Sequence, residues 1–257
     1  MRVLIAPDKF KGTLTARQAA KAIARGWGKS RPQDVLTLLP ISDGGDGFGH
    51  SSRRTARRET TTHQDRGRRT SPHHRDRWWQ PETKTAVIES ANIIGLAMLP
   101  AGKFHPFQLD TFGLGAVLRA ARRKGARQII LGIGGSATND GGFGVARALG
   151  WKFLDRHGEA IREWTQLPAL TTIHRPKRAL LKNLTVAVDV QNPCWVGAAR
   201  RACSDPKRDY APTILHPAER SLRRLTSVAK RQRNADFTAH SSAGAAGGLG
   251  FGLATFA

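Results

Sequence analysis

The sequence has few cysteines, few acidic residues and no long apolar run. Its 257 residues include only two cysteines, Cys194 and Cys203, which argues against a disulfide framework and fits a reducing cytoplasm. No run of about 18 or more apolar residues occurs, so we expect no transmembrane helix and no membrane partner. The apolar stretch near the N-terminus is too short for a signal peptide. We therefore expect a cytoplasmic protein, long enough to bury a sizeable core.

The shortage of acidic residues leaves a large positive charge. Against 42 Lys and Arg there are 19 Asp and Glu, which gives a formal net charge of +23. Such a charge ordinarily suggests a nucleic-acid or anionic-membrane partner. Here, however, residues 50–77 contribute +6 and residues 194–233 contribute +7, and the first of these segments contains no Val, Ile, Leu, Met or Phe. The remainder reads as an ordinary, mildly basic α/β sequence.

These two basic segments interrupt an otherwise regular pattern. A folded enzyme rarely breaks a β-α-β series with a long stretch that cannot bury anything. One interpretation is a disordered basic insertion that binds polyanions. The other, which we favour, is that the residues come from the wrong reading frame of a GC-rich gene. In either case, we predict that residues 50–77 are poorly ordered or packed only superficially.

Strand-like and helix-like segments alternate through the rest of the chain. Thr15 is a plausible N-cap for the first helix, and the first β-α-β alternation indicates a parallel sheet. We expect strands over residues 3–7, 35–40, 85–89, 128–133, 151–154 and 184–190, and helices over residues 15–26, 111–124, 142–149 and 244–256.

The strongest candidate site is the sequence Gly132-Ile133-Gly134-Gly135-Ser136-Ala137-Thr138-Asn139-Asp140-Gly141-Gly142. Successive glycines let backbone N–H groups converge on an anion, and Ser136, Thr138 and Asn139 add donors. Asp140 could hold a metal or act on a hydroxyl. We predict that this segment forms a tight turn at the end of a buried strand, with several N–H groups facing a cleft.

Four other clusters lie after apolar runs or at the start of helices. Lys11 could meet a phosphate with help from the following helix N-terminus, or be a solvated lysine beside an N-cap. Asp43 and Asp46 flank two glycines and could hold Mg²⁺, or form a plain turn. Asp189 at the end of an apolar strand is either a cleft residue or a strand-to-turn boundary. Residues 243–250 form another anion-binding turn or pack closely against a helix.

Two alternative functions have some support in the sequence. Gly132, Gly134 and Ala137 match the dinucleotide fingerprint, with Asp155 about twenty residues on, as in a NAD(P)-binding Rossmann oxidoreductase. Against this, residues 139–142 extend the loop where the fingerprint needs a helix at once. The basic segments would suit a polyanion-binding protein, but they lack interleaved aromatics and any nucleic-acid module. We therefore expect no specific nucleic-acid partner.

Taken together, the clusters resemble the bacterial glycerate kinase family, of the glycerate 2-kinase type. Residues 132–142 resemble its most specific signature almost letter for letter. Lys9 stands where the family's opening motif more usually has serine, and Cys194 follows Pro193 where Leu-Leu-Gly is expected. Further matching motifs, in the same order, occur at residues 6–12, 43–47, 111–115, 189–193 and 244–250.

The resemblance implies an α/β fold with two α/β domains. One is Rossmann-like and is assembled from both chain ends, and the other is inserted between them. We assign residues 1–75 to the first domain, with residues 50–77 as the anomalous basic segment, and residues 78–257 to the inserted domain. Family members run further, so we expect the Rossmann-like domain to be incomplete here and the activity to be weak.

The resemblance also implies ATP-dependent phosphorylation of D-glycerate to phosphoglycerate, with ATP and Mg²⁺. The acceptor hydroxyl, the acid that serves as base and the oligomeric state stay open. The implied roles are nucleotide binding for Gly134, Gly135, Ser136 and Asn139, catalysis for Lys11, Asp140 and Asp189, substrate binding for Asp8, Asp43 and Asn192, and metal binding for Asp43 and Asp46.

Overall fold

A computed structural model describes residues 1–10, 13–42, 57–61, 75–100, 103–188, 190–191 and 212–257. The chain begins with a small β-α-β unit, in which strands β1 (Arg2–Ile5) and β2 (Val35–Leu38) pair in parallel. Helix α1 (Ala16–Ser30) connects them. The Thr15 hydroxyl accepts a hydrogen bond from the Gln18 N–H at 3.2 Å, and the Gln18 side chain accepts from the Thr15 N–H at 2.9 Å. This capping box confirms the predicted N-cap, and the pairing of β1 with β2 confirms the predicted parallel arrangement.

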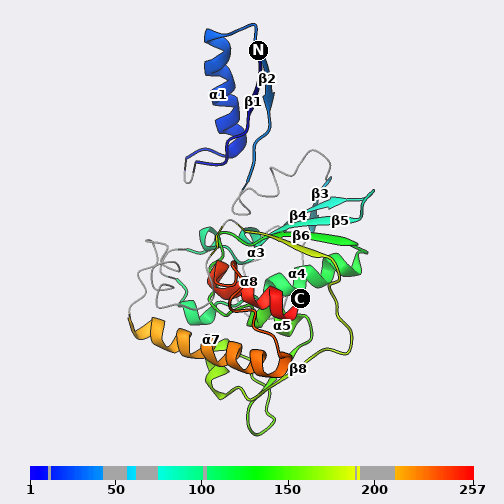
Figure 1. Cartoon of the computed structure of the whole chain (residues 1–257), viewed down its shortest axis with the longest axis vertical. Helices are drawn as coiled ribbons and strands as arrows, with labels where there is room; N and C mark the ends of the chain where they lie inside the picture. The colour runs from blue at the N-terminus through cyan, green and yellow to red at the C-terminus, as the bar shows by residue number, and fades with distance from the viewer. Residues whose placement is uncertain (11–12, 43–56, 62–74, 101–102, 189, 192–211) are drawn as a thin grey trace.

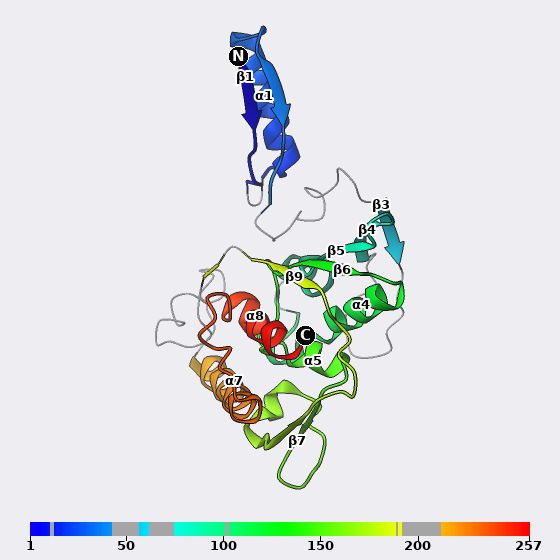
Figure 2. The ribbon, with the colours of Figure 1, turned by 45° about the vertical axis from the view of Figure 1, so that its right-hand side comes forward.

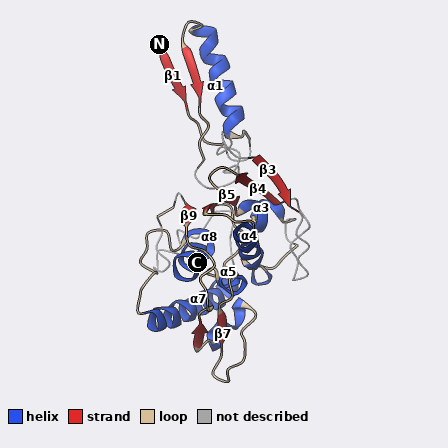
Figure 3. Cartoon of the chain, turned by 90° about the vertical axis from the view of Figure 1, so that its right-hand side faces the viewer, coloured by secondary structure: helices blue, strands red, loops and turns tan. Residues whose placement is uncertain are grey.

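The small unit buries little of its apolar surface. Figures 1, 2 and 3 show it standing apart from the rest of the molecule. Among the described residues, every exposed large hydrophobic side chain except Leu96 and Val190 lies in this unit. Two strands and one helix offer too few partners to cover these side chains. The exposed set is Met1, Leu4, Phe10, Leu14, Ile23, Trp27, Val35, Leu38, Leu39 and Ile41.

A five-stranded sheet organises the larger body, in the order β3-β4-β5-β6-β9. Strands β5 (Thr85–Glu89), β6 (Gln128–Gly132) and β9 (Leu184–Ala187) are parallel. Strands β3 (Arg57–Thr61) and β4 (Arg75–Gln80) add an antiparallel edge. The predicted α/β class is thus confirmed, and the larger sheet is mixed.

Strands β3 and β4 correct the interpretation of residues 50–77. We expected this segment to be poorly ordered or packed only superficially, and Arg57–Thr61 and Arg75–Gln80 pair at the edge of the sheet. An edge strand is held by backbone hydrogen bonds and tolerates charged side chains, so the missing aliphatics do not prevent pairing. The pairing also joins these residues to the larger body, so the expected boundary between residues 75 and 78 falls within β4. Residues 50–56 and 62–74 lie outside the described residues.

Helices and a hairpin complete the body. Helices α4, α5 and α8 pack around the sheet's core, and β7 pairs antiparallel with β8. None of the helices in the described part of the chain is long and apolar enough to span a membrane. The remaining elements are α3 (Ala91–Ile94), α4 (Phe112–Arg123), α5 (Phe143–Ala148), α7 (Pro212–Arg233), α8 (Ala245–Phe256), β7 (Lys152–Leu154), β8 (Thr172–His174) and the 3₁₀ helices η1 (Leu96–Met98), η2 (Pro106–Gln108) and η3 (Trp164–Ala169).

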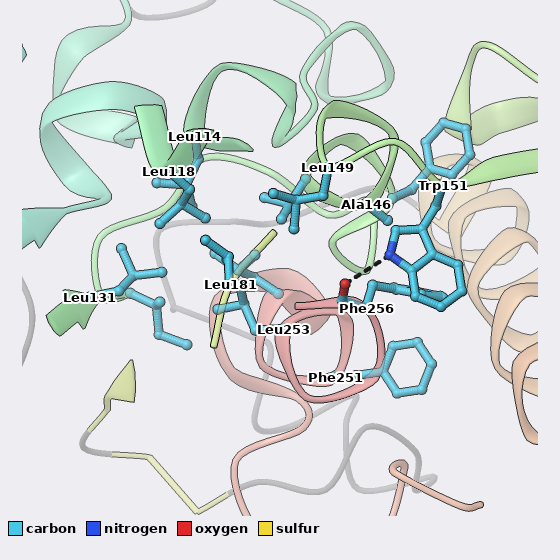
Figure 4. Close-up of a cluster of buried hydrophobic side chains, with 14 of the residues drawn as sticks. Leu114, Leu118, Leu131, Ala146, Leu149, Trp151, Leu181, Phe251, Leu253 and Phe256 are labelled. Carbon is cyan, nitrogen blue, oxygen red and sulfur yellow. Dashed lines mark hydrogen bonds between the residues drawn. The ribbon is translucent and has the colours of Figure 1, made fainter. Parts of the chain in front are cut away.

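The core joins segments that are distant in the sequence. Leu114 and Leu118 of α4 and Leu131 of β6 are fully buried and belong to the same cluster as Phe251 and Leu253 of α8 (Figure 4). At the end of α8, the Trp151 indole N–H donates to the Phe256 carbonyl at 2.8 Å, a bond that Figure 4 draws as a dashed line. The C-terminal helix is therefore fixed in the core by both apolar contact and a buried hydrogen bond.

Helix α7 corrects the interpretation of the second basic segment. We interpreted residues 194–233 as foreign to the fold, but Pro212–Arg233 form a helix of 22 residues. Leu225, Val228 and Ala229 are buried in the main core at spacings of three and four, which is the apolar face of an amphipathic helix. The many arginines occupy positions around that face and hide its period in the composition. Residues 194–211 lie outside the described residues.

We predict that truncating this apolar face destabilises the whole body. Leu225 is 0% exposed, so Leu225→Ala should lower the free energy of unfolding by about 2–5 kcal/mol. Ser227→Ala, at an exposed position of the same helix, is the matched control and should change it by less than about 0.5 kcal/mol. Urea unfolding followed by circular dichroism measures both. Equal midpoints for the two variants would mean that α7 is not packed as described.

Candidate functional site

The carboxyl ends of β5, β6 and β9 meet at one edge of the sheet. Glu89 at the end of β5 is in register with Gly132 of β6, and Gly132 is in register with Ala187 of β9. Residues 133–142, which we call the glycine loop, leave the sheet at this edge. Open α/β sheets bind ligands in the crevice beyond these strand ends. The strongest sequence candidate therefore lies where a parallel sheet presents a site.

The glycine loop is held on one side by the segment that follows β5. The Ser90 hydroxyl donates to the Gly134 carbonyl at 3.3 Å, and the Leu96 N–H donates to the Gly135 carbonyl at 3.0 Å. Gly135 adopts a φ of +73°, which glycine accepts without strain. The carbonyl and N–H of a trans peptide point in opposite directions, so the N–H groups of Gly135 and Ser136 face away from this segment.

Two amides of the glycine loop have free donors. Among the residues that the structure describes, neither the Gly134 N–H nor the Gly135 N–H has a hydrogen-bond partner. Gly135 is exposed and Gly134 is half-buried. The segment is a turn after a buried strand, as predicted. Consecutive free amides of this kind are the groups that receive an anion in glycine-rich turns.

Asp140 anchors the other end of the loop. Its side chain is fully buried, and its Oδ2 accepts hydrogen bonds from the Thr111 N–H at 2.9 Å and the Thr111 hydroxyl at 2.8 Å. The Gly144 N–H also donates to Oδ2 at 2.8 Å, and the Gly142 N–H donates to Oδ1 at 3.1 Å. Thr111 Oγ1 in turn accepts from the Val145 N–H at 2.9 Å. One carboxylate thus joins the start of α4, the loop and the start of α5.

The electrostatic setting of Asp140 is unusual for an aspartate. Burial and, to a smaller extent, the nearby carboxylate of Asp110 raise the pKa of Asp140 to about 6, although hydrogen bonds from Thr111 and Gly144 oppose the rise. The group is therefore charged at neutral pH. Below about pH 6 it takes up a proton that an ordinary aspartate would not hold.

Two other polar residues of the loop, Ser136 and Thr138, hydrogen-bond to each other. The hydroxyls of Ser136 and Thr138 share a hydrogen bond of 2.8 Å, and the Thr138 N–H donates to Ser136 Oγ at 3.2 Å. Both side chains are buried, whereas Asn139 is half-buried. The predicted residues Gly134, Gly135, Ser136, Asn139 and Asp140 are therefore brought together on a single loop.

The structure does not bring Asp8 to this loop. Asp8 lies on the small unit, which stands apart from the sheet in all three views, and its Oδ1 accepts a hydrogen bond from the Lys9 N–H at 2.6 Å. Among the described residues no group of three or more His, Cys, Asp and Glu could hold a metal ion. The other predicted site residues lie outside the described residues, namely Lys11, Asp43, Asp46, Asp189 and Asn192.

Sequence reasoning missed three residues at this edge, Glu89, Ser90 and Thr111. Glu89 is 2% exposed at the carboxyl end of β5, beside the start of the loop. The signal for Glu89 was available, because a carboxylate at the end of an apolar strand is the same pattern that singled out Asp189. Ser90 and Thr111 act through contacts with residues 44 and 29 positions away, for which the local sequence carries no sign.

The fold and loop define a class: an α/β protein with a glycine-rich turn that carries free amides at the carboxyl edge of parallel strands. The sequence profile of the glycerate kinase family matches residues 3–257, and the chain belongs to this family. Glycerate kinase of Bacillus subtilis (strain 168) is 34% identical over 260 residues, covering 100% of this chain and 68% of that protein. Glycerate 2-kinase of Escherichia coli (strain K12) is 32% identical over 267 residues, with 100% and 68% covered.

A solved structure supports the same assignment. The crystal structure described as glycerate kinase 2 from Salmonella typhimurium LT2 superposes with a TM-score of 0.78 at 29% identity, covering 100% of this chain and 70% of that one. The resemblance inferred from the motifs is thereby confirmed, and the chain is a transferase of the kinase type.

The two alternative functions gain no support from these relatives. The structure also shows why the dinucleotide fingerprint is a coincidence of spacing. A Rossmann turn leads directly into a helix, whereas α5 begins only at Phe143, six residues after Ala137. The intervening residues carry Asp140, which fastens the loop to α4 instead.

We predict a pH-dependent contribution of Asp140 to stability. Its pKa rises from 3.8 to about 6 on folding, so the folded state binds this proton more tightly. The contribution is present in full below pH 3.8 and is lost as the pH rises through 6, by about 3 kcal/mol. Urea unfolding from pH 4 to pH 7 measures this in the unmodified chain and in Asp140→Asn. The stability difference between the two should change by that amount. A difference that stays constant with pH would contradict the raised pKa.

Proposed function

We propose that this chain transfers the γ-phosphoryl group of ATP to a hydroxyl of D-glycerate, which gives phosphoglycerate. The family membership supports glycerate as the acceptor. The observation that carries the proposal is the pair of free amides, at Gly134 and Gly135, on a loop at the carboxyl edge of the sheet. Phosphoryl transfer depends mainly on positioning and charge stabilisation, and a rigid turn with free donors supplies both.

In this proposal the glycine loop receives phosphate oxygens. The N–H groups of Gly134 and Gly135 donate to them, and Asn139 contacts the nucleotide or the substrate from the same loop. Lys11 remains the proposed source of positive charge, and Asp189 the proposed base for the acceptor hydroxyl. Asp43, Asp46 and Asn192 keep their predicted roles toward substrate and Mg²⁺. When bound, Mg²⁺ would neutralise phosphate charge.

For Asp140 the geometry supports a different role from the one first assigned. The Asp140 side chain has no exposed area and accepts three hydrogen bonds at Oδ2 and one at Oδ1, so it is enclosed by the protein rather than open to a metal or a substrate hydroxyl. We propose that Asp140 is a positioning residue, which fixes the loop's far end against α4. The catalytic acid or base is then one of the other carboxylates at this edge.

We predict glycerate-dependent ADP release, measured by a coupled assay with ATP and D-glycerate on the purified chain. The rate should be well below that of the B. subtilis glycerate kinase, because this chain spans 68% of that protein. Asn139→Ala should lower kcat/KM by about tenfold or more, since it removes a polar contact to the reacting groups. Glu159→Ala, at an exposed position away from the loop, is the control.

Two results would overturn the proposal. One is a folded chain that binds neither ATP nor glycerate in calorimetry. The other is a chain that prefers an unrelated acceptor to glycerate. Tight binding of NAD(P) with no binding of ATP would restore the oxidoreductase alternative.

A further inference from the structure

The start of α8 has a backbone conformation that its sequence does not favour. Ala246, Gly247 and Gly248 have φ values of +53°, +68° and +84°, three left-handed residues in a row. A left-handed alanine costs roughly 1–2 kcal/mol relative to its usual conformations. Such a residue persists only where the surroundings determine it. The cause must therefore lie in what this turn contacts.

The turn and the helix behind it pack backbone against backbone on the glycine loop. The Gly141 N–H donates to the Gly247 carbonyl at 3.2 Å. A Cβ atom on Gly247 would lie 2.0 Å from the Thr138 carbonyl oxygen, and one on Gly252 would lie 2.5 Å from the Gly141 carbonyl oxygen. No side chain fits between the two segments. We call Gly247 and Gly252 the glycine face of α8.

Other residues of α8 are anchored in the core. Phe251, Leu253 and Phe256 are 2–4% exposed and belong to the main cluster, as Figure 4 shows. The Trp151 indole N–H donates a hydrogen bond to the Phe256 carbonyl. The helix is thus fixed in the core while its glycines touch the loop directly, so its position is transmitted to the loop without a flexible side chain in between.

We infer that the glycine face of α8 is a positioning element of the phosphate-receiving loop. It contacts the backbone of the loop within residues 138–142. Asp140 fastens the same stretch to α4, and the Ser90 hydroxyl donates to the carbonyl of Gly134. The inference rests on the proposed function and extends it to residues outside the loop. Of the two interpretations of residues 243–250, close packing accounts for these contacts, and the turn need not bind an anion itself.

The helix offers a matched pair of variants. Gly252→Ala places a methyl group 2.5 Å from Gly141, a contact that must widen towards the 3.4 Å of ordinary van der Waals distance. Ala254 is exposed on the same helix, so Ala254→Ser is the matched control. We expect only Gly252→Ala to move the loop.

Two measurements on each variant test the inference. The first is amide hydrogen exchange of peptides covering residues 132–142, which reports loop position without any need for activity. The second is turnover of ATP with D-glycerate per folded molecule. For Gly252→Ala we expect faster exchange in the loop and a kcat lowered on the order of a hundredfold, the effect of a displacement of about 1 Å at reacting groups. For Ala254→Ser we expect loop exchange and turnover close to those of the unmodified chain.

A second variant covers the case in which Gly252→Ala does not fold. Ala246→Gly adds no atom and removes the methyl group that makes the left-handed turn unfavourable, so it preserves the fold and relieves strain in the turn that contacts the loop. We expect slower exchange in residues 132–142 and a kcat no lower than that of the unmodified chain. Unchanged loop exchange in this variant, or equal loop exchange in Gly252→Ala and Ala254→Ser, would overturn the inference. Altered loop exchange without any turnover in the unmodified chain would leave the positioning intact and refute the proposed function instead.

Discussion

The hydrogen bonds to the buried carboxylate of Asp140 are the interaction on which the site depends. Four donors from Thr111, Gly142 and Gly144 converge on one side chain, so removing it would leave several buried donors without partners at about 1–3 kcal/mol each. The charge is tolerated inside the protein because these donors replace water. Its raised pKa shows that the replacement is incomplete, and the group remains in balance between burial and hydrogen bonding.

The larger body and the small unit both contain parallel strands joined through helices, but they bury different shares of their apolar side chains. In the body, β5 is buried along its whole length because helices cover it and β4 and β6 flank it. In the small unit, Ile5 and three alanines of α1 are buried, while Leu4 and Val35 are 60% and 61% exposed. Local signals are therefore enough to form the unit, and tertiary partners decide how much of its apolar surface is covered.

The elements that could be predicted are those whose sequence pattern lies within the element itself. Strands such as Gln128–Gly132 and the cap at Thr15 were predictable, because apolar runs, glycines and caps are local. Helix α7 was missed because arginines surround an apolar face of a few residues, and β3 was missed because an edge strand needs backbone bonds more than apolar side chains. The glycine loop was found by its composition. The burial of Asp140 was not, since its partner Thr111 lies 29 residues away.

The way the loop is held also bears on how it would act. A turn that bound phosphate by closing over it would need freedom before the ligand arrives. Here Ser90 donates to the Gly134 carbonyl, and Asp140 fixes the C-terminal end of the loop. Gly247 packs against the loop backbone at Thr138. Donors that are fixed in advance need no reorganisation when charge develops on a transferring group, which is the main source of electrostatic stabilisation in such sites. The strain at Ala246 is consistent with this view, because the fold maintains an unfavourable turn to keep the loop where it is.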